Sequence, residues 1–322
     1  MILITGGAGY IGSHTVHYLI TRGYKPSEIV VFDNLEHGHC EHLPKGVLFI
    51  KGDLLDRSEI GQAFKAYPIE SVIHFAAYAY VGESMANPYK YFLNNILGGL
   101  NLLEAMKDYG CRQVVFSSTC AVYGIPLKLP IDESEPIKPI NPYGESKATF
   151  ESILKWYDEI YGIRYVSLRY FNAAGADFGI GEWHEPETHL MPLTLKAVLD
   201  KDYTLSVFGT DYDTPDGTCI RDYVHVTDLA DAHLKALDYL KAGSRSEVFN
   251  LGFQRGISVK EIISIVEDIT GNKVIYKTSG RRVGDPPVLV ASSAKAGSVL
   301  CWSAKRDIRD IIKSAYSWHC NR

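Results

Sequence analysis

The sequence predicts an α/β protein built on a doubly wound parallel sheet, with a smaller mixed α/β domain after it. Through the first half of the chain, short runs rich in β-branched residues alternate with longer helical patterns. Each short run is almost continuously apolar, which is typical of strands in a parallel sheet that helices cover on both faces. From about residue 173 this alternation stops, and loops containing Gly and His replace it. These observations predict a ligand site at the carboxyl ends of the parallel strands.

The elements of the first domain follow in order. We expect strands at residues 1–5, 29–34, 47–54, 71–77, 113–118 and 165–170. Between them we expect helices at residues 9–23, 57–67, 94–110 and 148–162. Farther on, a long loop region precedes a helix, a short strand at residues 205–209 and the loop 210–226. We therefore divide the chain into a dinucleotide-binding domain, residues 1–172, and a mainly substrate-binding domain, residues 173–322, with a return to the first domain around residues 218–245.

The composition limits the class of protein. The chain has 322 residues, 46% of them hydrophobic and 22% charged, with a formal net charge of −5. This charge argues against a nucleic-acid binder, which normally carries a basic patch or stripe. None of the six cysteines belongs to a C-x-x-C pair, so neither a zinc site, nor any other metal site, nor a disulfide framework is predicted. The chain enters a strand at once and holds no apolar run of about 18 residues. We therefore expect a cytoplasmic protein without a signal peptide or a membrane span.

A glycine-rich turn follows the first strand directly and opens the first helix. In "TGGAGYIG", Gly6, Gly9 and Gly12 follow the spacing G-x-x-G-x-x-G, a variant of the dinucleotide-binding fingerprint of Rossmann-type folds. Glycine lets the backbone approach a pyrophosphate at the helix N-terminus, where exposed amides favour the anion. Asp33 ends the second strand, where its carboxylate can accept hydrogen bonds from ribose hydroxyls and repel a 2′-phosphate. The pattern favours NAD over NADP.

Residues at two further places can be assigned either to cofactor binding or to ordinary structural roles. Asp53 follows a strand and can reach an adenine amino group, and Ala76 and Ala77 are small enough for a backbone to pass close to a cofactor. Ordinary loop and packing roles explain these residues equally well on spacing alone.

A tyrosine and a lysine lie four residues apart in "PYGESK", at the start of a helix. Tyr143 and Lys147 share one helix face, because residues at i and i+4 are neighbours. A phenol has a pKa near ~10 and is a poor base at neutral pH, but a nearby ammonium and a positive nicotinamide ring together favour its ionised form. Ser117, Ser118 and Thr119 end a strand upstream, and a hydroxyl there can relay a proton from the same substrate oxygen. The pattern predicts a proton-transfer site.

Together these segments resemble the short-chain dehydrogenase/reductase superfamily of the extended type, over nearly the whole chain, and within it the UDP-hexose 4-epimerases. The resemblance rests on "TGGAGYIGSH", "FDNL", "VIHFAA", "VGES", "NPYGESK", "RYFNAAGA", "HLMP" and "FNLG", and most characteristically on "TDYDTPDGTCIRDY". It implies reversible epimerisation of UDP-galactose and UDP-glucose at C4 of the sugar, through a transient 4-keto intermediate and enzyme-bound NAD. It also implies a homodimer formed through two helices of each subunit.

The resemblance further implies a role for each matching residue. The catalytic residues are Tyr143, which takes the proton of the 4-hydroxyl group, together with Lys147 and Thr119. The residues that contact NAD are Gly6, Gly9, Tyr10, Ile11, Gly12, Asp33, Asn34, Asp53, Leu54, Phe75, Ala76, Ala77, Asn95, Ser117, Tyr143, Lys147 and Tyr170. The residues that bind the UDP-sugar are Thr119, Tyr143, Asn172, His189, Leu190, Phe208, Arg221, Arg282, Asp285 and Leu289.

The chain departs from the family pattern at two positions. Ala79 stands where some members carry a lysine that touches the cofactor. Leu289 is intermediate in size between the bulky and the small residues associated with excluding or admitting N-acetylated sugars. Epimerisation of UDP-N-acetylhexosamines therefore stays an alternative.

The sequence argues more strongly against some other activities of this fold than against others. A 4,6-dehydratase needs an Asp-Glu pair after the catalytic threonine, whereas Cys120 and Ala121 follow Thr119 here. A nucleotide-sugar dehydrogenase that releases NADH shares the first half-reaction, so it remains a less favoured alternative. A silent NAD-binding regulator would have no reason to keep Tyr143, Lys147 and Thr119 together.

Overall fold

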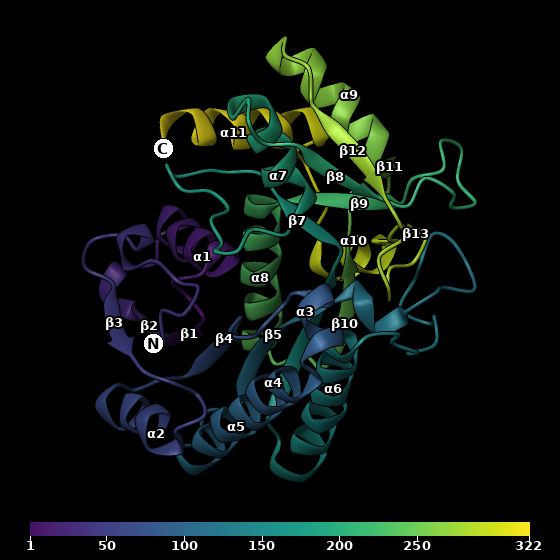
Figure 1. Ribbon diagram of the computed structural model, residues 1–322. Helices are drawn as coiled ribbons and strands as arrows, with labels where there is room; N and C mark the ends of the chain where they lie inside the picture. The colour runs from purple at the N-terminus through teal and green to yellow at the C-terminus, as the bar shows by residue number, and fades with distance from the viewer.

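A large parallel sheet forms the lower half of the molecule in Figure 1, which shows a computed structural model of residues 1–322. Its seven strands lie in the order β10-β6-β5-β4-β1-β2-β3, and all neighbours run parallel. The strands are β1 (Ile2–Thr5), β2 (Ile29–Asp33), β3 (Leu48–Lys51), β4 (Ser71–His74), β5 (Gln113–Thr119), β6 (Arg164–Tyr170) and β10 (Glu247–Leu251). The predicted Rossmann-type sheet is thus confirmed.

Helices cover both faces of this sheet and explain why its strands are apolar on both sides. In β1, Ile2 and Ile4 point into one core cluster, whereas Leu3 points into another on the opposite face. The helices on the first face are α1 (Tyr10–Thr21) and α8 (Val226–Lys241), and those on the second are α2 (Arg57–Ala66), α5 (Gly98–Asp108) and α6 (Pro142–Tyr161). Full burial of each such aliphatic side chain stabilises the fold by about 1.5–3 kcal/mol.

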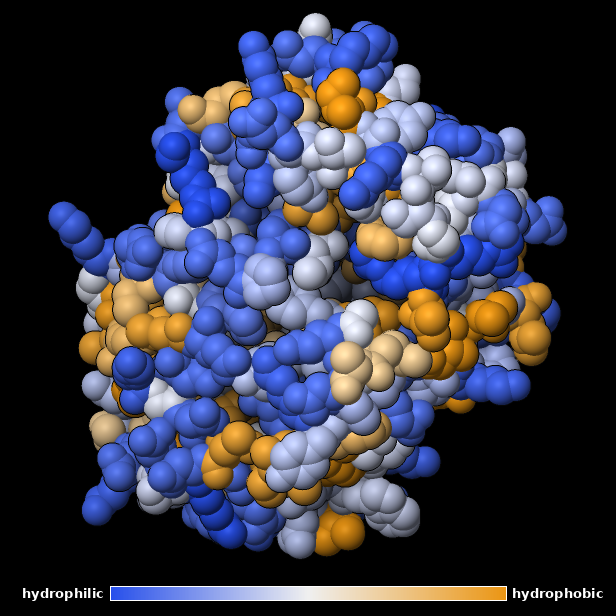
Figure 2. Space-filling view, viewed as in Figure 1, coloured by the Kyte–Doolittle hydropathy of each residue, from blue (hydrophilic) through white to orange (hydrophobic).

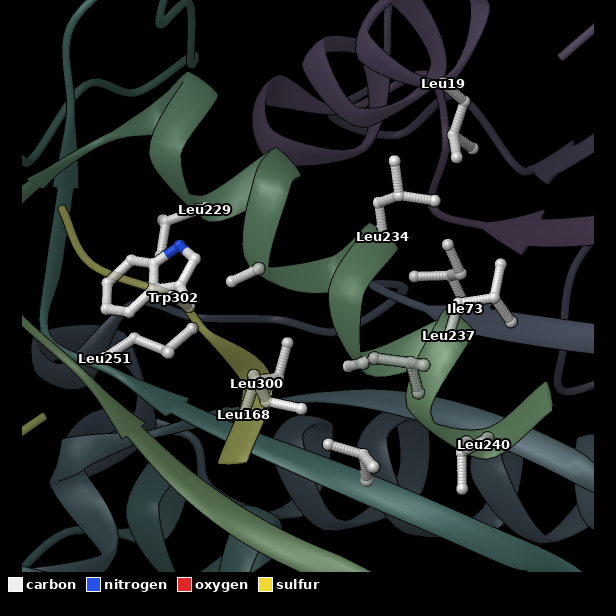
Figure 3. Packing of buried hydrophobic residues seen from close by; sticks show 14 of the residues in the cluster. Leu19, Ile73, Leu168, Leu229, Leu234, Leu237, Leu240, Leu251, Leu300 and Trp302 are labelled. Carbon is white, nitrogen blue, oxygen red and sulfur yellow. The ribbon is translucent and has the colours of Figure 1, made fainter. Parts of the chain in front are cut away.

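The first core lies around α8, as Figure 3 shows. Leu234 and Leu237 point from α8 toward α1 and the sheet, while Leu229 meets the indole ring of Trp302. The indole nitrogen donates a hydrogen bond to the Asp228 carbonyl oxygen at 2.9 Å, so its one polar atom is satisfied in the core. The C-terminal part of the chain is thereby tied to the large sheet.

Two local differences from the predicted elements have physical causes. Strand β3 alternates between half-buried and exposed residues, with Phe49 37% exposed, because it lies at the edge of the sheet. The helix expected at residues 94–110 begins earlier. It consists of α4 (Pro88–Phe92), a π-helical turn η3 (Leu93–Leu97) and α5. Hydrophobic spacing does not signal the extra residue of a π turn, which is frequent at functional sites.

The smaller part of the molecule lies above the sheet in Figure 1 and has its own core. Its strands are β7 (Asn172–Ala174), β8 (Leu205–Phe208), β9 (Ile220–His225), β11 (Gly256–Ser258), β12 (Tyr276–Ser279) and β13 (Val288–Leu289). Its helices are α7 (Leu190–Leu199), α9 (Val259–Thr270) and α11 (Ile308–Asn321). Helix α10 (Ala294–Leu300) packs instead against α8 and β10, in the first core of the large sheet. Strand β9 is central, since β7, β11 and β13 all pair with it.

The remaining short elements connect these layers. They are the helix α3 (Val81–Ala86) and the 3-10 turns η1 (Pro26–Glu28), η2 (Cys40–His42) and η4 (Cys120–Tyr123). After β9, the chain runs through α8 to β10, which joins the large sheet beside β6. Every helix is too short or too polar to cross a lipid bilayer.

Candidate active site

A cavity of about 990 Å³ opens between the large sheet and the smaller part. Figure 2 shows a recess near the centre of the face of the molecule that is in view. The residues at or just after the carboxyl ends of five strands line it: Gly6 after β1, Asp33 of β2, Phe75 after β4, Thr119 of β5 and Tyr170 of β6. This is the edge at which doubly wound sheets bind their ligands.

The glycine turn at the start of α1 is a close backbone contact that tolerates no side chain. Gly6 has φ +70°, and a Cβ atom there would lie 2.5 Å from the backbone nitrogen of Ala76. A Cβ on Gly12 would lie 2.2 Å from the Gly6 carbonyl oxygen. Gly9 precedes α1 as its N-terminal cap and faces the cavity. The turn therefore leaves the helix N-terminus open toward the cavity, as an anion site requires.

Two carboxylates border the cavity beyond this turn. Asp33 accepts hydrogen bonds from the backbone N–H groups of Ala8 and Leu35, both at 2.9 Å. Asn34 donates from its side chain to Asp53 at 3.3 Å. Each bonded oxygen of Asp33 keeps a lone pair for an adenosine hydroxyl, and Tyr10, Ile11, Leu54, Ala76 and Ala77 complete this wall. The donor and acceptor pattern fits an NAD adenosine half.

The start of α6 brings the predicted catalytic group to the cavity. Asn141 caps the helix by accepting a hydrogen bond from the Gly144 backbone N–H at 2.8 Å. This cap fixes the first helical turn, so Tyr143 and Lys147 point into the cavity on one face. Thr119, at the end of β5, lines the same place. The three predicted catalytic side chains therefore converge, and all are more than nine-tenths buried.

Burial changes the proton affinities of this group. It raises the pKa of the Tyr143 phenol above its ordinary value, with the charge of Tyr170 acting in the same direction and the Thr119 hydroxyl against it. The sequence predicts a lowered pKa when Lys147 and a positive nicotinamide ring act together, and in the protein without the cofactor burial outweighs the other influences. Burial also lowers the pKa of Lys147 to about 7, against the opposing charge of Glu151.

The Lys147 ammonium has one hydrogen bond and one carboxylate nearby on the same helix. The ammonium donates to the Ser117 carbonyl oxygen at 2.8 Å. Glu151 lies one turn farther along α6 and forms a buried ion pair with Arg169 at 2.5 Å. Sequence reasoning missed Glu151, although its i, i+4 spacing from Lys147 is a signal that was available.

Two residues predicted to contact NAD lie behind the cavity wall. Asn95 accepts a hydrogen bond from the backbone N–H of Tyr78 at 2.9 Å and donates to the Ser146 hydroxyl at 3.0 Å. The Ser117 hydroxyl lies 3.0 Å from His233 Nε2. Both side chains are engaged with the protein and neither lines the cavity, so their placement supports the wall and shows no direct contact with a ligand.

The predicted UDP-sugar residues fall into two groups. Asn172, His189, Leu190, Arg282 and Leu289 line the main cavity together with Thr119 and Tyr143. The others do not.

Arg221 is buried and forms an ion pair with Asp285, which borders a second cavity of about 650 Å³. Phe208 is 38% exposed, and the guanidinium of Arg282 lies 4.6 Å from the centre of its ring. Arg282 takes part in no ion pair in the structure and lines both cavities, so its guanidinium group is free to bind an anion.

One cluster on the cavity wall was not foreseen. It lies in the loop between β7 and α7, where Glu182, His184, Glu187 and His189 bring their side chains together. Sequence reasoning had assigned only His189 of these four, because the spacing within a loop does not show which side chains converge.

Comparison with known proteins adds the family. Residues 2–252 match the model of the "NAD dependent epimerase/dehydratase family". The UDP-glucose 4-epimerase of Streptococcus mutans is 51% identical over 322 residues, which cover 99% of this chain and 96% of that protein.

Two solved structures have the same fold over almost their full length. The crystal structure of UDP-glucose 4-epimerase from Brucella ovis in complex with NAD is 46% identical, with a TM-score of 0.93, covering 98% of this chain and 97% of that one. The structure from Bifidobacterium longum in complex with NAD+ and UDP is 36% identical, with a TM-score of 0.94, covering 100% of this chain and 98% of that one.

Proposed function

The chain belongs to the NAD dependent epimerase/dehydratase family, and from this premise we propose that it interconverts UDP-galactose and UDP-glucose at C4 of the sugar, with NAD as its cofactor. The observation that carries the proposal is the convergence of Tyr143, Lys147 and Thr119 on a cavity that the glycine turn also borders. A proton-transfer group and a dinucleotide cradle in one cavity are what a redox-neutral epimerisation needs.

The residues on the sheet side fit NAD. The open N-terminus of α1 takes the pyrophosphate, and the Asp33 carboxylate takes the adenosine ribose hydroxyls. When bound there, NAD would supply a reversible acceptor for the hydride at C4 of the sugar. A 2′-phosphate would meet the buried Asp33 carboxylate, so NADP is disfavoured.

Tyr143 removes the proton from the sugar 4-hydroxyl group and later gives it back. Thr119 orients that hydroxyl, because its side chain lies at the same place on the wall. A phenol with a raised pKa is a poor base, so proton removal depends on positive charge near Tyr143. Lys147 supplies one such charge, and the oxidised nicotinamide supplies another.

The UDP group lies against the smaller part. Arg282, free of ion pairs, forks onto the phosphate oxygens, and Phe208 beneath it borders the uracil. Arg221 and Asp285 hold each other in place, and we propose that Asp285 also accepts from the ribose hydroxyls. Asn172, His189 and Leu190 complete the contacts.

The test uses UDP-galactose without added NAD. Purified enzyme should form UDP-glucose, detected by chromatography, with no accumulation of NADH. NADH rising in proportion to sugar consumed would instead identify a dehydrogenase. Absence of any sugar-nucleotide turnover, with NAD confirmed in the sample, would refute the proposal.

We propose UDP-N-acetylglucosamine as a second, poorer substrate. Leu289 is buried in β13 and lines the cavity, where its side chain leaves more room than a tyrosine and less than a small residue. Turnover should be measurable but lower than with UDP-galactose. A coupled assay that shows none at high enzyme concentration would exclude it.

The domain division, the assembly state and the location rest on the same premise. We propose residues 1–172 as the NAD domain and residues 173–322 mainly as the UDP-sugar domain, with the return through β9, α8 and β10. We also propose a cytoplasmic enzyme, whose six free cysteines suit a reducing compartment.

A homodimer is proposed through α6 and the run from α4 to α5, which lie side by side in Figure 1. Exposed apolar side chains mark both helices, including Leu97, Trp156 and Ile160. Sedimentation equilibrium should give twice the chain mass, and a monomer at working concentration would contradict the proposal.

A further inference from the structure

We propose that Glu182, His184, Glu187 and His189 form a site for one divalent cation of the zinc class, which clamps the loop before α7 at the edge of the cavity. The proposal is independent of the epimerase reaction. It rests on the donor set of these four side chains, on the spacing of their atoms and on the polar atoms left without partners around them.

The donor atoms of the four side chains lie close enough together to share one ion. His184 Nδ1 lies 3.5 Å from a Glu182 oxygen and 3.6 Å from a Glu187 oxygen. His189 Nδ1 lies 2.8 Å and 3.1 Å from oxygens of the same two carboxylates. Zinc binds nitrogen and oxygen donors at ~2.0–2.2 Å, so the edges of its tetrahedron measure about 3.3–3.6 Å. The two distances from His184 agree with this edge, and the two from His189 are shorter. The two histidines face different oxygens of Glu187, so its carboxylate would turn to present one of them to the ion.

The composition of the cluster selects the cation. Two imidazoles and two carboxylates suit zinc and its neighbours in the first transition row, whereas calcium and magnesium prefer oxygen alone. Ligand atoms of the four residues all lie within 4.8 Å of one another. No other group of three or more His, Cys, Asp or Glu side chains in the chain meets that spacing.

Polar atoms without partners gather at this cluster. His184 Nδ1 is buried and makes no hydrogen bond. The hydroxyl group of Tyr80 is also buried without a partner, and the Tyr80 ring lies 5.9 Å from that of His184 and 5.7 Å from that of His189. Buried polar atoms are normally satisfied, and one that is not often marks a missing ion or water. A cation between the four donors would take up the free lone pair of His184.

Aromatic contacts hold the loop that carries the four side chains. The rings of Tyr10 and Tyr80 meet His184 edge to face. Trp183 stacks on His39 with ring centres 4.1 Å apart. His189 is the residue before α7, and its side chain is 40% exposed toward the cavity. A cation here would fix the start of α7 and the position of Leu190 at the nucleotide-sugar wall.

The test measures binding of zinc to the full-length protein after treatment with a chelator. Competition with a chromophoric chelator should give one zinc per chain for the wild type. Glu187→Gln removes one anionic donor at nearly constant shape, and zinc should bind at least about 100-fold more weakly. Glu185→Gln is the matched control, because Glu185 lies in the same loop but is exposed and outside the cluster. This variant should bind zinc as the wild type does.

Cobalt is the second probe, and it tests the wild type without any substitution. Cobalt(II) on two nitrogens and two oxygens should give the intense visible bands of a tetrahedral site, while a strong near-ultraviolet thiolate band would place the ion on an exposed cysteine and overturn the proposal. Equal zinc affinity in Glu187→Gln and Glu185→Gln, or no stoichiometric uptake by the wild type, would also overturn it. Zinc should raise the melting temperature of the wild type and of Glu185→Gln, but not that of Glu187→Gln.

Discussion

The two walls of the cavity are built from different parts of the chain, namely backbone atoms on one side and side chains on the other. On the sheet side, backbone meets backbone: the turn of Gly6 and Gly12 leaves no space for a single methyl group. On the side of the smaller part, side chains from separate segments make the wall, among them those of His189 and Arg282. A wall of backbone fixes one ligand, the dinucleotide, whereas a wall of side chains can be retuned by substitution. Tyr143 lies where the two walls meet.

The largest effect is expected at this junction. Tyr143→Phe removes the proton-transfer group and keeps the ring, so turnover of UDP-galactose should fall by at least about two orders of magnitude. Bound NAD, measured after extraction, should stay near the wild-type amount. Near-normal turnover would remove Tyr143 from the mechanism.

A larger residue in the glycine turn should weaken the binding of NAD. Gly12→Ala places a methyl group 2.2 Å from a backbone oxygen, and overpacking of about 1–3 kcal/mol corresponds to about 5- to 150-fold weaker NAD binding. Gly61→Ala in α2 is the control, because a Cβ atom there meets nothing within 4 Å. Equal NAD affinity in the two variants would show that the glycine turn does not set the cofactor fit.

The Lys147 ammonium should make the stability of the cofactor-free protein depend on pH. Burial lowers its pKa to about 7, so between that pH and the ordinary value near ~10.4 the unfolded chain binds the extra proton. The free energy of unfolding therefore rises with pH over this window, by at most about 1.4 kcal/mol per unit from this group. Below pH 7 the cost of the buried charge is fully present.

Lys147→Met isolates this contribution, since other groups titrate in both proteins. Urea unfolding at several pH values from 6 to 9 should show a smaller rise for the variant than for the wild type. Parallel curves would mean that Lys147 titrates in the folded protein as it does in the unfolded chain.

The smallest effect is expected on the side-chain wall. Arg282→Lys keeps the charge and loses the planar fork, so KM for UDP-galactose should rise up to about tenfold with little change in kcat. Arg281→Lys is the control, because Arg281 pairs with Asp211 at the surface. A loss confined to kcat would assign Arg282 a part in the chemistry instead of in binding.

The backbone wall was also the more predictable one. Its residues are close in sequence, so the strand, the glycine spacing and the acid after the second strand predict the turn and its helix. The N-terminal cap of α6 is equally local, since Asn141 accepts a hydrogen bond from a backbone amide three residues on. The order of strands in the sheet is the order that parallel α/β connections favour.

The side-chain wall depends on contacts between distant segments, which local patterns do not carry. The ion pair of Arg221 with Asp285, which lies outside the main cavity, joins β9 to the segment before β13. On the cofactor side, hydrogen bonds to other parts of the chain hold Asn95 and Ser117 behind the wall. The raised pKa of Tyr143 follows from burial in the assembled fold. Spacing identified these residues, and only the three-dimensional arrangement shows which of them face the cavity.

The position of β10 at the end of the large sheet has a consequence for biosynthesis. This strand pairs with β6, yet residues 172–225 of the smaller part are made between them. While only residues 1–172 have been made, β6 is an edge strand although it is interior in the complete sheet, and such unpaired edges invite aggregation. Strand β6 becomes interior only once β10 has emerged and paired with it. Truncation before residue 251 should therefore leave nascent chains dependent on chaperones, whichever ligand is present.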